Sequence, residues 1–359
     1  MKNRNLRNMV LVALGFAAVL SGCGRSAEQT PLPSGTDLVV CTDLEPAVYE
    51  PVVKEFEERT GLSVEVLADT TADIQSRFAP DPAKQQAWDL AFGVSTELLE
   101  AYPNLWEPYE SGQEAMIAEK FCSPDHSWTA FSVLPLVIMY NTNVVTYREL
   151  PSGWESLLEP RWQGRVAFAD PETSDVSQTA LAAAVLTTPK GEDYPGDLAV
   201  NLNYRTLSRL EQVNEGILDG RYSVGVTTEE AAQALRSSGA DIDYIYPEEG
   251  TLAVLDGSAV RAGCEHEEAA RQFLEFTVSK EVQKILSASR SRRSVRTDVP
   301  AEKGMDLFER LPFPDVDAET ISAEKREAMA AWEAALRGNL AAETEDSQPD
   351  ATSAKGGAS

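Results

Sequence analysis

The stretch Trp128-Thr-Ala-Phe-Ser-Val-Leu-Pro-Leu-Val-Ile-Met-Tyr140 decides how this chain folds. Its β-branched and aromatic residues predict one long, buried strand. Pro135 interrupts the stretch, and proline cannot donate a backbone hydrogen bond to a neighbouring strand. We interpret the stretch as the first strand that crosses from one lobe of the protein to the other.

Before this strand, apolar strands alternate with amphipathic helices. Predicted strands cover residues 37–42, 63–68 and 89–93, and predicted helices cover 47–59, 71–78 and 97–101. The first helix has Val48, Val52, Val53 and Phe56 at helical spacing. This order predicts an α/β fold with a largely parallel sheet.

The same alternation continues after the strand. Helices are predicted over 154–158, 177–186, 228–236, 267–278, 279–286 and 324–336, and strands over 166–168, 220–227, 241–246 and 258–262. We expect a first lobe of residues 37–135 and 250–300, and a second lobe of 136–249 and 301–340. Residues 341–359 are acidic and lack an apolar period, which predicts a disordered tail.

The first residues of the chain indicate export. Lys2, Arg4 and Arg7 precede an apolar run from Met9 to Leu20, and Leu-Ser-Gly-Cys23 follows. A basic segment, a short apolar core and small residues describe a signal peptide, here residues 1–22. The four residues Leu20 to Cys23 resemble the bacterial lipobox. This resemblance implies that Cys23 is lipidated. The mature protein is then anchored to a membrane surface, facing the periplasm or the cell exterior, through a polar tether of residues 23–36.

Composition narrows the possible partners. The formal net charge is −27, and such a field repels the phosphates of nucleic acids. An anionic ligand needs strong local hydrogen-bond donors to overcome this field. The two histidines, His126 and His266, lie in polar loops, and the sequence contains no CxxC motif or Cys/His cluster. A zinc site is therefore not expected.

Three cysteines remain after Cys23, so at most one intramolecular pair can form among them. Cys41 ends a buried apolar run, whereas Cys122 and Cys264 lie in polar segments. Exported proteins can form disulfides. We therefore predict a Cys122–Cys264 disulfide and a free Cys41, although sequence alone does not fix the pairing.

Four stretches resemble a known family. They are Val137-Ile-Met-Tyr-Asn-Thr, Trp154-Glu-Ser-Leu-Leu-Glu-Pro-Arg-Trp-Gln-Gly-Arg-Val-Ala-Phe-Ala-Asp-Pro, Tyr246-Pro-Glu-Glu-Gly-Thr and Ser279-Lys-Glu-Val-Gln. In this order they resemble the extracellular solute-binding proteins of ABC importers, in the ferric-ion and organophosphate branch of the type-2 periplasmic binding proteins. The resemblance implies a two-lobed clamshell with crossing strands at a hinge. It also implies a monomer that delivers a solute to a permease and ATPase, with no catalysis and no cofactor.

Turns between strands and helices supply the candidate ligand-binding residues. Ligands of open α/β sheets bind beyond the carboxyl ends of strands, where helix N-termini offer free N–H groups. The candidates are Thr42, Asp43, Glu45, Thr70, Thr71, Ser95, Thr96, Ser174, Ser177, Gln178, Thr179, Thr227, Thr228 and Glu229. Each of these residues also has a simpler explanation, because Ser, Thr and Asp are good helix N-caps.

The candidate residues favour an organophosphate or phosphonate over iron. Iron binders of the family carry adjacent tyrosines at the start of a second-lobe helix, where this chain has Thr227-Thr228-Glu229-Glu230. Hydroxyl groups and helix N-termini suit an oxyanion, and Asp43, Glu45 and Glu229 suit hydroxyl or amino groups on the same ligand. A ferric-ion binder and a ligand-sensing receptor subunit remain as alternatives.

Overall fold

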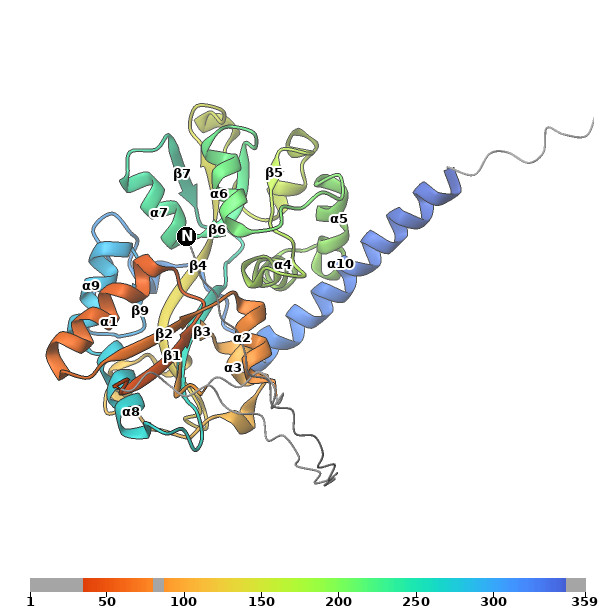
Figure 1. Cartoon of the computed structure of the whole chain (residues 1–359). Coiled ribbons are helices and arrows are strands. Elements are labelled where there is room, and N and C mark those ends of the chain that lie inside the picture. The colour runs from red at the N-terminus through yellow and green to blue at the C-terminus, as the bar shows by residue number, and fades with distance from the viewer. Residues whose placement is uncertain (1–34, 80–86, 347–359) are drawn as a thin grey trace, which may run out of the picture.

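The computed structural model describes residues 35–79 and 87–346 (Figure 1). The signal peptide, Cys23 and most of the predicted tether lie outside these ranges, as do residues 347–359. Two lobes of α/β structure lie one above the other in Figure 1, and strands β4 and β8 run between them. In the described ranges, no helix combines the length and the apolar character that a membrane crossing requires.

One nine-stranded sheet extends through both lobes. Its main path has the order β2-β1-β3-β8-β4-β6-β5, and β7 and β9 pair with β4 off this path. The strands are β1 Leu38–Thr42, β2 Val64–Ala68, β3 Leu90–Ser95, β4 Thr129–Asn141, β5 Val166–Ala167, β6 Val224–Thr228, β7 Ile242–Ile245, β8 Ala253–Val260 and β9 Arg293–Ser294.

The sheet is mixed, so the prediction of a largely parallel sheet is wrong. The pairs β1–β2, β1–β3 and β5–β6 are parallel. All pairs made by the two crossing strands are antiparallel. The prediction failed because β8 begins at Ala253, five residues before the expected start, and returns between the lobes antiparallel to β4. The two crossing strands run in opposite directions, so every pair that they make is antiparallel. The pairs that do not involve them are parallel in both halves of the sheet.

Strand β4 crosses between the lobes as predicted. Its first part, Thr129 to Pro135, pairs with β8, and its second part, Leu136 to Asn141, pairs with β6 and β7. The change of partner falls at Pro135, which lies opposite Ala253. Because proline lacks a backbone donor, the ladder is weakest at this point, where a hinge needs to bend.

The first lobe packs helices on both faces of its half of the sheet. Its helices are α1 Pro46–Thr60, α2 Thr71–Phe78, α3 Thr96–Glu100, α8 Glu267–Thr277 and α9 Lys280–Arg290. Leu38 and Val40 of β1 contribute to one buried cluster, with α1 and α8. Val39 and Cys41 contribute to the other, on the α2 and α3 side. This split follows from the two-residue period of a strand.

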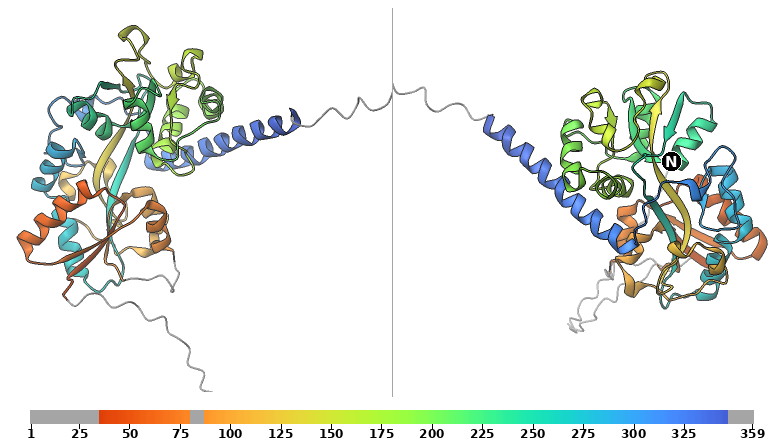
Figure 2. Two further views of the ribbon diagram at one scale, coloured as in Figure 1. Left: turned by 45° about the horizontal axis from the view of Figure 1, so that its top comes forward. Right: turned by 180° about the vertical axis from the view of Figure 1, so that it is seen from behind.

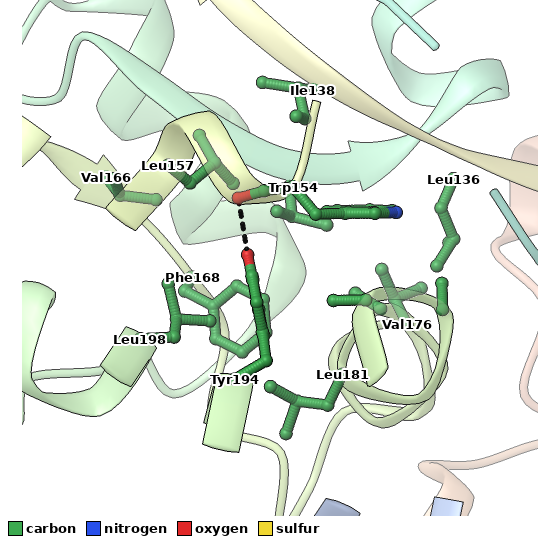
Figure 3. Packing of buried hydrophobic residues seen from close by; sticks show 14 of the residues in the cluster. Leu136, Ile138, Trp154, Leu157, Val166, Phe168, Val176, Leu181, Tyr194 and Leu198 are labelled. Carbon is green, nitrogen blue, oxygen red and sulfur yellow. Dashed lines mark hydrogen bonds between the residues drawn. The ribbon is translucent and has the colours of Figure 1, made fainter. Parts of the chain in front are cut away.

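The second lobe repeats this arrangement with α4 Asp175–Thr187, α5 Tyr194–Asn201, α6 Leu210–Leu218 and α7 Glu229–Ser237. Trp154, from the long family-like stretch, is fully buried, and its carbonyl accepts a 2.9 Å hydrogen bond from the Tyr194 hydroxyl (Figure 3). The predicted helix at this stretch is a 3₁₀ helix, Glu155–Leu158. Helices α5 and α6 were not predicted from the sequence.

The C-terminal helix α10, Ala318–Asp346, is longer than predicted at both ends. It begins beside α3, packs against α4 and α5, and projects away from the body (Figures 1 and 2). Trp332, from its middle, is fully buried in the second-lobe core. The helix extends to Asp346 and so covers the first residues of the predicted tail, 341–359. The final turns are rich in Ala and Glu, which have high helix propensity even without an apolar face.

The predicted disulfide does not form. Cys41, Cys122 and Cys264 are all free thiols in the described chain. Cys122 packs with the cluster of Val39 and Cys41, whereas Cys264 packs with the cluster of Leu38 and Val40. The two thiols therefore lie on opposite faces of one sheet, and a disulfide requires Cβ atoms within about 4.5 Å.

Candidate functional site

A cleft of about 700 Å³ lies between the lobes. The first lobe supplies the turns after β1 and β3 and the segment from Ala288 to Arg292. The second lobe supplies the starts of α4, α6 and α7. Leu134 of β4 and Val254 and Asp256 of β8 form the hinge side of the cleft. The cleft thus lies beyond strand ends and beside helix starts, as ligand sites in α/β folds do.

Five predicted residues line the cleft: Asp43, Glu45, Thr71, Ser95 and Thr228. Thr71 donates a 2.8 Å hydrogen bond from its hydroxyl to Asp43 Oδ2. Thr228 is the N-cap of α7, and its hydroxyl accepts a 3.3 Å hydrogen bond from the backbone N–H of Ala231. Four strand-to-helix turns on two lobes therefore converge on one space.

The other predicted residues of the first lobe do not line the cleft. The fully buried Thr42 hydroxyl donates to the carbonyl of Phe92 and fixes the turn after β1. Thr70 is the N-cap of α2 and bonds Asp73. Thr96 is buried and lines a different hollow, behind the hinge. These hydroxyls stabilise helix starts and turns, as the simpler explanation predicts.

The predicted residues at the start of α4 are also absent from the lining, because each bonds locally. Ser174 caps α4 by accepting from the Ser177 N–H, and Thr179 donates to the Asp175 carbonyl at 2.8 Å. Gln178 donates to the Pro171 carbonyl at 2.6 Å. Asp175 and Val176 of this turn do line the cleft, and neither was predicted from the sequence.

Thr227 and Glu229 are buried away from the cleft. The Thr227 hydroxyl donates to Asn214 Oδ1 at 2.7 Å. Glu229 is fully buried and accepts hydrogen bonds from Arg293 and from the Tyr246 hydroxyl. Its carboxylate is therefore occupied by an ion pair within the protein.

Arg292 also lines the cleft and is not among the residues predicted from the sequence. Its buried guanidinium holds Glu230 through two bonds of 2.9 and 3.0 Å and donates to Ser132 Oγ at 2.9 Å. It also pairs with Asp256. The available signal was the basic run Ser289-Arg-Ser-Arg-Arg-Ser-Val-Arg296 in a strongly acidic chain.

The lining carries seven carboxylates and two guanidinium groups. They are Asp43, Glu45, Asp175, Glu211, Glu230, Asp256 and Glu302, and Arg290 and Arg292. Burial raises the pKa of Asp43 above its ordinary value. Burial likewise raises the pKa of Asp256 to about 6, although Arg292 opposes the shift. A ligand therefore needs hydrogen-bond donors or positive charge to satisfy these oxygens, besides any anionic group held by the arginines.

Ion pairs connect the two lobes across the cleft. Arg292, after α9, holds Glu230 on α7, and Arg293 holds Glu229. Lys325 of α10 bonds Asp175 at 3.0 Å and also Glu97 of α3. Asp175 in turn accepts a 2.9 Å hydrogen bond from the Ser95 hydroxyl. These contacts hold the lobes close together in this structure.

The cleft lining contains no tyrosine, histidine or cysteine among the described residues. In the same ranges, no three His, Cys, Asp or Glu side chains lie in an arrangement that could hold a metal ion. Ferric iron prefers hard oxygen ligands, and the lining offers these only as dispersed carboxylates.

Two lobes joined by crossing strands, with a polar cleft between them, define a protein that captures a solute by closing around it. The sequence profile of the bacterial extracellular solute-binding protein family matches residues 92–323. This chain belongs to that family. It is a solute-binding protein of an ABC importer and not an enzyme.

Several relatives are similar along most of their length. Iron uptake protein A1 of Synechocystis is 24% identical over 286 residues, which cover 76% of this chain and 78% of that protein. Iron-bound HitA of Pseudomonas aeruginosa has a TM-score of 0.72 at 21% identity, covering 83% of this chain and 98% of HitA. AfuA of Actinobacillus pleuropneumoniae, with fructose-6-phosphate bound, has the same TM-score and identity, covering 84% and 98%. These two structures support the shared two-lobed fold.

Proposed function

We propose that this protein captures a small organophosphate or phosphonate that also carries hydroxyl or amino groups. The supporting observation is the mixed chemistry of the cleft. Arg290 and the N-terminus of α7 at Thr228 favour an oxyanion. Carboxylates such as Asp43 and Glu45 can accept hydrogen bonds from the hydroxyl or amino groups of the ligand.

The size of the cleft supports the same proposal. A volume of about 700 Å³ is in the range of pockets that enclose organic ligands, and a bare ferric ion occupies far less. The absence of phenol and imidazole groups from the described lining also removes the side chains that the resemblance associates with iron. The bound fructose-6-phosphate of AfuA shows that this fold accommodates a sugar phosphate.

Ferric iron is the second candidate, because most of the similar proteins are named for iron or ferric-ion binding or were solved with iron bound. In this case the carboxylates Asp43, Glu45, Glu230 and Asp256 provide the oxygens, and a bound anion completes the coordination. This arrangement requires Arg292 to release Asp256 and Glu230, which it holds in the present structure.

Mass spectrometry of the compound released from gently purified protein identifies the ligand directly. Calorimetry with ferric citrate, sugar phosphates and aminoalkylphosphonates then compares the candidates. We expect binding of a phosphorylated compound and none of ferric iron. Tight binding of iron with a carboxylate-type spectrum, and no heat with any organophosphate, refutes the proposal.

We also propose that Cys23 anchors the mature protein to the membrane, where it delivers the solute to a permease. The basis is the lipobox-like Leu20-Ser21-Gly22-Cys23 sequence after an apolar core. The alternative role is that of a ligand-sensing receptor subunit, which would use the same cleft. Monomeric behaviour in solution, expected from the resemblance, is measured by light scattering.

A further inference from the structure

A second hollow lies behind the hinge, on the opposite side of the crossing strands from the cleft. Val254 and Asp256 of β8 face the cleft, whereas Ala253 and Leu255 line this hollow. Strand β4 divides its side chains in the same way, with Leu134 toward the cleft. Alternate residues of one strand point to opposite faces. A single layer of backbone therefore separates two cavities.

The hinge hollow has an aromatic and apolar interior. Its volume is about 530 Å³, within the range of small-molecule sites. Trp128, Phe121 and Phe313 contribute aromatic side chains to its lining. Phe308 connects the last two, with ring centroids 5.6 Å from Phe121 and 5.2 Å from Phe313. This interior is suited to the apolar body of a ligand.

The charged lining residues of the hinge hollow that the structure describes are all acidic. Its lining includes Glu97, Glu100, Glu119, Asp317 and Glu319, and none of its described lining side chains is basic. Lys325 pairs with Glu97 but does not line the hollow. The Glu100 carboxylate interacts with the Trp128 side chain, which places a negative charge beside the aromatic wall.

We propose that the hinge hollow is a second binding site, for a small organic cation with an apolar body. Aromatic rings attract cations through their electron-rich faces, and carboxylates attract them by charge. A neutral apolar compound gains nothing from the carboxylates, and an anion is repelled by them. The proposal does not rest on the identity of the cleft ligand, so the proposed function can fail without affecting it.

The experiment uses benzyltrimethylammonium as the probe and benzenesulfonate as the anionic comparison, at physiological salt. The mature chain is labelled with ¹⁵N-tryptophan, and Trp128→Phe assigns one of the six indole resonances. We expect the cation to shift the Trp128 resonance in a saturable manner, and benzenesulfonate to leave it unchanged.

Glu100→Gln tests the charge while keeping an oxygen that can accept from the indole. Losing one partly exposed ion pair should weaken binding roughly two- to fivefold. Glu110→Gln is the matched control, because Glu110 is exposed on the same lobe and does not line the hollow. The proposal is overturned if both variants weaken binding equally, since the affinity for the cation then depends only on the net charge of the protein. It is also overturned if benzenesulfonate binds as well, or if Trp128 does not respond.

Discussion

At the scale of single residues, the arginine after α9 decides how the cleft is held together. Arg292 joins Glu230 of the second lobe to Asp256 of the hinge and is only 8% exposed. Breaking a buried ion pair is costly because the remaining charges stay desolvated. The two carboxylates depend on this single cation.

Arg292→Met removes that cation while keeping an unbranched side chain. We expect the free energy of unfolding in urea to fall by about 3 kcal/mol. Arg221→Met is the control, because Arg221 is exposed and pairs with exposed Asp219. Adding Asp256→Asn to Arg292→Met should recover part of the lost free energy of unfolding, since it removes one of the two carboxylates left without a cation. Equal losses in the Arg292 and Arg221 variants contradict the assigned role.

Thr228 has two roles that can be separated. It caps α7 and lines the cleft, whereas Thr70 caps α2 through a bond of the same 3.3 Å length and does not line the cleft. Thr228→Val and Thr70→Val should each cost about 1 kcal/mol of stability.

For the compound identified by mass spectrometry, only Thr228→Val should weaken binding, by roughly 10- to 150-fold, because a donor to a charged oxygen is lost. Calorimetry of both variants measures the difference. Unchanged affinity in Thr228→Val shows that the ligand does not contact this hydroxyl.

At the scale of elements, α10 is tied to the second lobe by its middle turns. Trp332 is fully buried against Phe168, with ring centroids 6.1 Å apart. Ala328, one turn earlier, is also buried. The helix is therefore part of the second-lobe core for this part of its length.

Trp332→Ala should lower the free energy of unfolding by roughly 3–5 kcal/mol, the usual cost of removing a large core side chain. Val200→Ala is the control, since Val200 lies on α5, which packs against α10, but is 50% exposed. Urea denaturation of both variants measures the difference. A small loss for Trp332→Ala shows that α10 is dispensable to the fold.

At the scale of the whole molecule, the Lys325 contacts make closure of the lobes sensitive to pH. Burial, followed by the charge of Asp175, raises the pKa of Glu97 to about 7, while Lys325 opposes the shift. Opening the lobes separates Glu97 from Asp175 and returns its pKa toward 4.5. The closed form therefore binds a proton more tightly, and closure is favoured as pH falls from about 7 toward 4.5.

Small-angle scattering of the ligand-free protein tests this coupling. We expect a smaller radius of gyration at pH 5.5 than at pH 8, and Glu97→Gln should remove most of the difference because it cannot ionise. Glu58→Gln, an exposed change on α1, should keep it. A Glu97→Gln variant with the full pH response disproves the coupling.

Membrane attachment is also a property of the whole molecule. Cys23→Ser removes the proposed lipidation site, so the variant should appear in the soluble fraction or retain its signal peptide. Fractionation and intact-mass measurement report both outcomes. If the variant is cleaved at the same place and remains with the membrane, Cys23 is not the anchor.

The sequence alone predicted most of the elements, because periodicity and capping are local. The helix starts at Thr70, Thr228 and Ser279 are capped as their residue types indicate. The crossing strand around Pro135 was also evident from its length and apolar content. The four family-like stretches predicted the class of protein, which the family match confirms.

Only the tertiary structure decided which polar residues meet in the cleft. The hydroxyls of Thr42, Ser174 and Thr227 bond within the protein, and a sequence pattern does not distinguish such a bond from a ligand contact. The pairing of Arg292 with Asp256 and Glu230 joins residues 36 and 62 positions apart. The separation of Cys122 from Cys264 likewise depends on which face of the sheet each segment covers. Such contacts arise from the packing of distant segments, which no local period encodes.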